Sequence, residues 1–511
     1  MIQEYNTYIQ HLRRLQKIES LYALWNYSCN VSNKFNRPLD SVIEFDPKKY
    51  NDKSVFKLSV FWWENLVRDT LAYSGRYYSE KNLCSRQQLA RAWNYWNTFS
   101  WKCTELIHER YWSHKVVHSL LLLAHDQFIS QAELYNLYCK YLALYLYPPL
   151  KSYIESQLWI SIECVFTLWL LYFTLAWSSF VNDKDSQIKW LDINDNDLQQ
   201  FHKLFSIEIE KISDAIIEEI NKADELDLPY AWKWLLVRYP AYIIESNKII
   251  CPLPHMFIYR ITFWLVYDFV GDGKNDGKFW DLFWSAFESL IWEIINVEND
   301  IYKKRIVVEW WKWTGVVDAD WFIQEDEALF IIECKTKKLK YKTKSLITDI
   351  HPMEEDISII ADALIQSYKS SCAENISPKF KDGDNFKQKY CIVALLEETF
   401  MWLFESFDST EYKGMLDGVI TTKLQNMGIS KKEFNSNKYL VLSSTEFEVM
   451  VQMAGKKSFR ELIEWKYSKY SWYFWIQWFI SETYPSDMET LRSPFYNKYI
   501  KQVSDKIQIS L

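Results

Sequence analysis

The sequence contains very little glycine. Ten glycines occur among 511 residues, about 2% of the chain, whereas globular proteins usually contain roughly 7%. Residues 1–270 contain one glycine, Gly75. Tight turns and helix C-termini favour glycine because they need a positive φ angle. A folded segment of this length with one glycine therefore requires an explanation.

Tryptophan shows the opposite deviation. The chain has 26 tryptophans, 14 of them in residues 1–270, and glycine and tryptophan together make up about 7% of the chain, which is ordinary. Many of these positions would be glycine if the organism reads UGA as glycine, as some bacterial lineages do. The alternative is a protein rich in aromatic residues. The gene distinguishes the two, because a majority of UGG codons would rule out the glycine interpretation.

Other absences exclude several classes of protein. Nine cysteines are scattered without a Cys-x-x-Cys pair or a Cys/His cluster, which argues against a disulfide framework and a structural zinc site. We therefore expect a reducing compartment, the cytoplasm, and the N-terminus has no apolar signal core. The net charge of −8 excludes binding to nucleic acid by overall charge, so such binding would need a local patch.

Residues 1–250 are rich in apolar residues at spacings of three and four, which predicts a mostly helical region of unknown role. Residues 164–181 are uncharged and reach the length of a membrane-span candidate. The other interpretation is a central helix of a helical domain. No basic cluster flanks the segment, so we expect no stable membrane association, and a membrane-associated protein remains the alternative.

The pattern changes after residue 250. We expect a connector over 251–278 with a glycine-containing loop at 271–278, a mixed domain over 279–455 and a C-terminal helical extension over 456–511. Within 279–455 the order is a helix, three strands, a helix and two later strands. This predicts an α+β or α/β fold class, in which a mostly helical N-terminal region precedes a small mixed-sheet domain.

Three residues in this domain form a candidate site. If residues 316–337 form a hairpin with its tip at 326–327, Asp320 lies across from Glu333. Lys335 shares the face of Glu333, because side chains at i and i+2 of a strand point the same way. Two carboxylates suit Mg²⁺ or Mn²⁺, and the lysine can position water or stabilise developing charge. The alternative is a solvated surface hairpin.

The segments DADWFI (318–323) and ALFIIECKTKK (328–338) resemble the core of the PD-(D/E)XK, or restriction-endonuclease-like, nucleases. In that family the Asp opens the second core strand and Glu-x-Lys lies on the third. The Pro that names the motif is absent, because Ala319 precedes Asp320, and Asp318 is a rival ligand. The resemblance covers about a third of the chain.

The resemblance also implies residues on the flanking helices. A Glu on the helix before the strands often contacts the metal, which makes Glu288 the candidate and Glu293 a weaker one. Many members have glycine where this chain has Trp284. A Gln or Tyr on the helix after the third strand recurs in some branches, which points to Gln366 or Tyr368.

The expected activity is therefore Mg²⁺-dependent or Mn²⁺-dependent phosphodiester hydrolysis. The resemblance implies DNA in preference to RNA, a role in bacterial restriction or anti-phage defence, and allows a homodimer. Six lysines in residues 335–344 either line a phosphate path or form a solvated loop. The main alternative is a nuclease fold without catalysis that serves in binding or as a scaffold.

Overall fold

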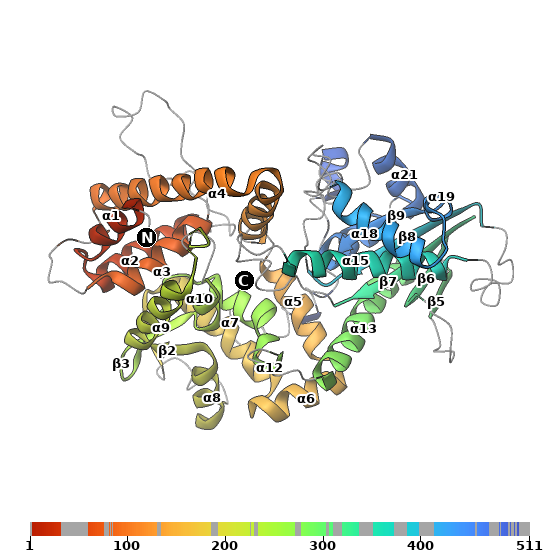
Figure 1. Ribbon diagram of the computed structural model, residues 1–511. Coiled ribbons are helices and arrows are strands. Elements are labelled where there is room, and N and C mark those ends of the chain that lie inside the picture. Colours follow the sequence, from red (N-terminus) through yellow and green to blue (C-terminus); the bar gives the residue numbers. More distant parts are fainter. Residues whose placement is uncertain are drawn as a thin grey trace.

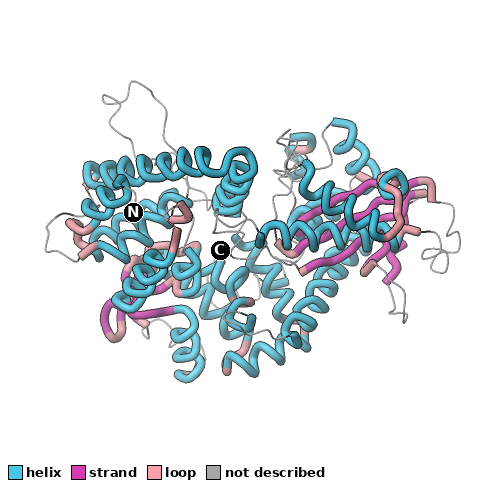
Figure 2. The backbone as a smooth tube through the Cα atoms, viewed as in Figure 1, coloured by secondary structure: helices cyan, strands magenta, loops and turns pink. Residues whose placement is uncertain are grey.

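The structure is a computed structural model with two main parts (Figures 1 and 2). Helices dominate residues 3–302, and the larger sheet and its helices follow. The structure describes most of the chain in separate stretches. These are residues 3–31, 60–75, 85–129, 134–184, 193–224, 226–228, 233–270, 277–302, 306–309, 319–325, 327–336, 351–372, 386–397, 413–454 and 457–469, together with Lys81, Leu83 and short pieces within 480–499.

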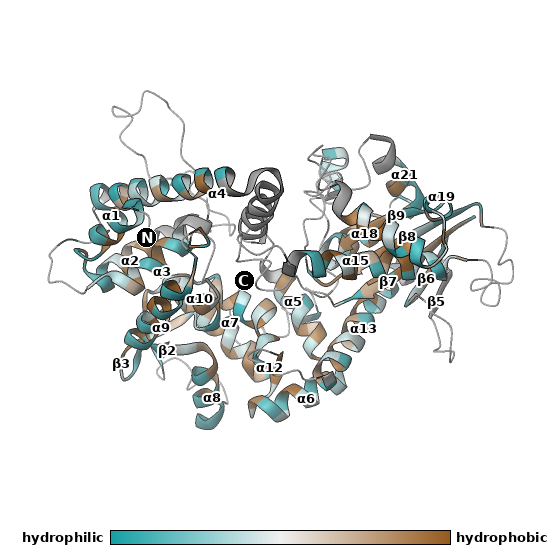
Figure 3. Ribbon diagram, viewed as in Figure 1, coloured by the Kyte–Doolittle hydropathy of each residue, from teal (hydrophilic) through white to brown (hydrophobic). Residues whose placement is uncertain are grey.

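The N-terminal part packs amphipathic and buried helices against each other. In Figure 3, hydrophilic and hydrophobic residues alternate along α4, as expected of a helix with one buried face. Ser161 accepts a hydrogen bond from the Cys164 N–H and so caps α7, most of which is buried. The helices are α1 (Gln3–Leu12), α2 (Lys17–Val31), α3 (Val60–Tyr73), α4 (Arg86–Ile129), α5 (Leu134–Tyr145), α6 (Pro148–Leu158), α7 (Ile162–Ser178), α8 (Asp195–Phe205), α9 (Ile209–Lys222) and α10 (Lys233–Arg238).

A small sheet interrupts this helical part. Its order is β1-β4-β3-β2, with β1 (Val181–Asp183), β2 (Ser206–Glu208), β3 (Ala241–Glu245) and β4 (Lys248–Ile250). The sequence pattern predicts one helical segment over 202–227, but the structure divides it into α8, β2 and α9. Pairing of β2 with β3 accounts for the difference, because tertiary strand pairing overrides helical propensity there.

No single helix among the described residues is long and apolar enough to cross a membrane. Helices α6 and α7 meet that test only as a pair, and they are bent by 72° at the break between them. The residues of the expected 251–278 connector form α11 (Met256–Tyr259), a π-helical turn (Arg260–Trp264) and α12 (Tyr267–Val270), while 271–276 lie outside the described residues.

The larger sheet has five strands in the order β5-β6-β7-β8-β9 among the described residues. The first three strands are antiparallel, and β7, β8 and β9 run parallel. Glu325 pairs with Ala328, so the β6–β7 hairpin turns between these two residues, where the sequence predicts a turn. The strands are β5 (Ile306–Glu309), β6 (Trp321–Glu325), β7 (Ala328–Lys335), β8 (Gln388–Leu395) and β9 (Lys438–Ser443).

Helices cover both faces of this sheet (Figure 1). On one face, α15 (His351–Ser370) and α18 (Lys413–Asn426) form a core with Val393 and Leu395. The other face joins the core that contains α13 (Gly277–Tyr302) and the N-terminal helices. This continuous core ties the two parts together. The remaining helices are α19 (Lys431–Phe434), α20 (Ser444–Met453), α21 (Phe459–Lys469) and α23 (Pro485–Met488).

Trp159 has an unusual backbone conformation. It ends α6 with φ 58° and ψ 27°, and its N–H donates a hydrogen bond to the Glu155 carbonyl. Among the described non-glycine residues it alone has a positive φ. Its side chain is 76% exposed, so packing does not account for the conformation. Glycine is the residue most often found in this conformation at the end of a helix.

Candidate active site

The β6–β7 hairpin brings Asp320 next to Glu333. Trp321 pairs with Ile332, and the Asp320 N–H donates a hydrogen bond to the Ile332 carbonyl at 3.0 Å. The Cys334 N–H donates to Asp320 Oδ2 at 2.6 Å. This backbone contact fixes the Asp320 carboxylate at the end of β7. Sequence reasoning missed it because a backbone donor leaves no signal in residue type.

Glu333 and Lys335 lie where β7 leaves the core. Apolar residues bury the strand through Cys334, and Glu333 itself has no exposed surface. The Lys335 side chain is 25% exposed, and its Nζ lies 2.5 Å from Glu333 Oε1. The same Nζ donates to Gln366 Oε1 at 3.2 Å. Glu333 of the strand and Gln366 of a helix therefore both contact the Lys335 ammonium.

Helix α15 positions Gln366. Its apolar residues, among them Ile360 and Leu364, pack under the sheet in the core that contains Val393 and Leu395. That packing places Gln366 above the end of β7. Tyr368, the other candidate on this helix, instead packs its ring against Phe434, with 5.5 Å between ring centroids. Gln366 is thus the α15 residue that contacts Lys335.

Helix α13 supplies the third carboxylate. Trp284 contacts β7 through its indole N–H, which donates to the Cys334 carbonyl at 3.4 Å. Glu288 lies one helical turn further on, and its carboxyl group donates a hydrogen bond to Asp320 that lowers the pKa of Asp320. Glu293, the weaker candidate, forms an ion pair with Lys498 at 3.4 Å instead. Asp318 and the lysines at 337–344 lie outside the described residues.

Burial disfavours the charge of both carboxylates, Asp320 and Glu333. Burial raises the pKa of Glu333, the neighbouring Asp320 raises it further, and Lys335 partly offsets both. Burial also raises the pKa of Asp320, although Glu288 and the Cys334 N–H oppose the shift. Two acidic groups are thus held together in a buried position that a bound cation would stabilise.

The site offers an oxygen ligand to a hard divalent cation. Buried Glu333 Oε2 has no hydrogen-bond partner in the described structure, so an oxygen ligand is available beside Asp320. No cluster of three or more His, Cys, Asp or Glu side chains among the described residues is arranged to hold a metal ion. Mg²⁺ commonly uses one or two carboxylates and keeps several waters, which agrees with a partly protein-built site.

Glu397 is a further buried carboxylate near the site, and the sequence did not point to it. Leu396 N–H donates to the Lys335 carbonyl at 3.1 Å, and Glu397 follows directly. The Tyr141 hydroxyl of α5 donates to Glu397 Oε1 at 3.4 Å. No sequence signal pointed to Glu397, because its partner lies 256 residues away in the chain.

No protein-family model, curated protein or solved structure matches this chain.

Proposed function

We propose that this protein is a metal-dependent nuclease that hydrolyses phosphodiester bonds, with DNA as its substrate. The observation that supports this most strongly is the convergence of Asp320, Glu333 and Lys335 at one end of β7. Gln366 accepts a hydrogen bond from the Lys335 ammonium there. Glu288 joins the group from the preceding helix. These elements follow the order that the PD-(D/E)XK resemblance implies. The proposal rests on this site, since the fold by itself does not specify a reaction.

Asp320 and Glu333 would hold Mg²⁺ or Mn²⁺, and Glu288 would support Asp320. The bound cation would lower the pKa of a water molecule and neutralise charge on the phosphate. Lys335 keeps its ammonium beside this position through Glu333 and Gln366. From there the ammonium orients the attacking water and stabilises the negative charge that develops on the phosphate oxygens. Burial excludes bulk water and strengthens both interactions.

A role in bacterial restriction or anti-phage defence is proposed from the resemblance alone. Because the net charge is −8, the substrate would have to be held by local groups rather than by overall charge.

A cleavage assay tests the substrate and the site together. Linear double-stranded DNA, single-stranded DNA and RNA of one sequence are incubated with the protein and Mg²⁺ or Mn²⁺. We expect DNA to be cut, and Glu288→Ala to slow cutting by about 10–100-fold, as loss of a residue that supports a metal ligand commonly does. Glu293→Ala, on the same helix but paired with Lys498, serves as the control and should cut at the wild-type rate.

Cutting of RNA alone would contradict the choice of substrate. A folded protein that cuts none of the three with either metal would contradict the enzyme proposal. That result would favour the alternative, a nuclease-like fold that binds or scaffolds without catalysis.

A further inference from the structure

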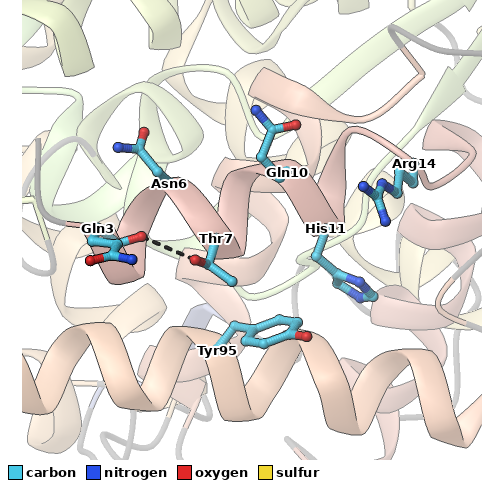
Figure 4. Close-up of a pocket in the computed structure, with 7 residues that line it drawn as sticks. All are labelled: Gln3, Asn6, Thr7, Gln10, His11, Arg14 and Tyr95. Atoms are coloured by element: carbon cyan, nitrogen blue, oxygen red, sulfur yellow. Dashed lines mark hydrogen bonds between the residues drawn. The ribbon is translucent and has the colours of Figure 1, made fainter.

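A polar pocket lies between α1 and α4, within the helical region whose role the candidate active site does not explain. Its volume is about 320 Å³, at the small end of ligand pockets. It is lined by Gln3, Asn6, Thr7, Gln10, His11, Arg14 and Tyr95. In Figure 4, Tyr95 of α4 lies across from Thr7 and His11, while Asn6 and Gln10 project from the other edge of α1.

One end of the pocket gathers positive charge. A backbone bridge between Leu15 and Lys81 places Lys81 beside the end of α1, next to Arg14. Gly75 makes this arrangement possible, because its N–H donates to the Leu15 carbonyl at a backbone φ of +77°. Arg91 lies on α4 one turn before Tyr95 and is exposed, as are Arg14 and Lys81.

The cations at this end of the pocket affect the pKa of His11. Its Nε2 donates a hydrogen bond to the Gln88 carbonyl at 3.3 Å, which leaves Nδ1 as an acceptor. Burial lowers the pKa of His11, and Arg91, Arg14 and Lys81 lower it further. Of these three cations, Arg14 lines the pocket, whereas Arg91 and Lys81 lie outside its lining. A negatively charged group entering this end would be attracted by all three cations.

The remainder of the pocket offers stacking and uncharged hydrogen bonds. Tyr95 is 37% exposed, and its ring meets the His11 ring edge-on at 5.5 Å, which fixes its orientation. The side-chain amide of Gln3 can donate and accept hydrogen bonds. The Thr7 hydroxyl already donates to the Gln3 carbonyl at 3.1 Å. An exposed aromatic ring with an amide and an arginine in the same pocket matches a base joined to a phosphate.

We infer that this pocket binds one nucleotide unit, with its phosphate at Arg14, which lines the pocket, and its base against Tyr95. The unit could be a free nucleotide or part of a nucleic-acid strand, and both present the same phosphate and base. The inference does not depend on catalysis by the β7 site.

Binding is measured without divalent metal, in EDTA at low salt, so that cleavage plays no part. The probes are fluorescein-labelled (dT)12, followed by anisotropy, and ATP, followed by calorimetry. We expect Arg14→Ala and Tyr95→Ala each to weaken binding of at least one probe by about tenfold, from loss of a phosphate contact and of stacking. Tyr95→Phe should bind within about twofold of wild type because the ring remains.

Lys102→Ala is the matched control, since Lys102 is also on α4 but pairs with Glu105, and it should bind like wild type. Thermal melts show whether each variant is folded. Loss with (dT)12 alone assigns the pocket to a strand, and loss with ATP assigns it to a free nucleotide. The inference is overturned if the wild type binds neither probe, or if folded Arg14→Ala and Tyr95→Ala proteins bind both as the wild type does. Neither result alters the cleavage test of the β7 site.

Discussion

At the residue scale, the central feature is a pair of buried carboxylates held beside one ammonium. Asp320 is fixed by the Cys334 N–H, and Glu333 is fully buried with Lys335 at 2.5 Å. Such an arrangement opposes folding when no cation is bound, because burial disfavours both charges and Asp320 further disfavours the charge of Glu333. Residues that destabilise a fold in this way are typical of functional sites.

This opposition predicts that Glu333→Gln stabilises the metal-free protein. In EDTA at pH 7 we expect the free energy of unfolding to rise by about 1 kcal/mol, since the variant removes the repulsion with Asp320 while Lys335 is partly solvated. Mg²⁺ should then raise the free energy of unfolding of the wild type but not of the variant. Urea unfolding with and without Mg²⁺ measures both effects. A variant less stable than wild type in EDTA would contradict the role assigned to this repulsion.

A second prediction concerns His202, which is far from the candidate site. Burial lowers the pKa of His202 to about 4, and Lys184 contributes. The unfolded chain has a pKa near 6.5, so between pH 6.5 and 4 it binds more protons than the folded chain, and stability falls as pH falls. We expect a loss of about 1–2 kcal/mol between pH 7 and 5. Unfolding of wild type and His202→Gln at both pH values measures it, and equal losses in the two would exclude His202 as the cause.

At the element scale, the sequence predicted the parts of the site better than its surroundings. An apolar run on each side of a short acidic turn was sufficient to place the β6–β7 hairpin and to put Asp320 opposite Glu333. The break of the 202–227 segment by β2 was not predictable, because β2 pairs with β3, more than 30 residues later. The contact between Gln366 and Lys335 also depends on how α15 packs, which local pattern does not specify.

The end of α6 provides a test at this scale. Trp159 adopts the left-handed conformation with an exposed side chain, so Trp159→Gly should raise the free energy of unfolding by about 1 kcal/mol. Trp101 is the matched control because it is 65% exposed in the interior of α4, and Trp101→Gly should lower stability by about 0.5–1 kcal/mol. Chemical denaturation measures both. Destabilisation by Trp159→Gly would contradict the preference for glycine at this position.

At the scale of the whole molecule, the helical region and the larger sheet share one core. Helix α5 contacts the sheet region through Lys140, whose ammonium donates to Ser444 and Thr445 hydroxyls at 3.2 and 2.6 Å. Glu448 of α20 lies 3.9 Å away, and both charged side chains are almost fully buried. The sequence could not predict this contact, because its partners lie more than 300 residues apart.

This interface predicts the effect of Lys140→Ala. Removing the ammonium leaves Glu448 buried beside an empty position, so we expect a loss of about 3 kcal/mol in unfolding free energy. Lys102→Ala, at an exposed ion pair, should change it by less than about 1 kcal/mol. Tryptophan fluorescence and circular dichroism should report one common transition for the wild type, since the core is continuous. Two separated transitions would contradict a shared core.

The most direct test of the nuclease proposal is the rate of DNA cleavage at saturating Mn²⁺ by wild type, Glu333→Ala and Lys335→Ala. We predict metal-dependent cutting by the wild type and a loss of at least about 100-fold in each folded variant, because one removes a metal ligand and the other the charge beside the phosphate. Cutting by either variant at the wild-type rate would contradict the proposed site.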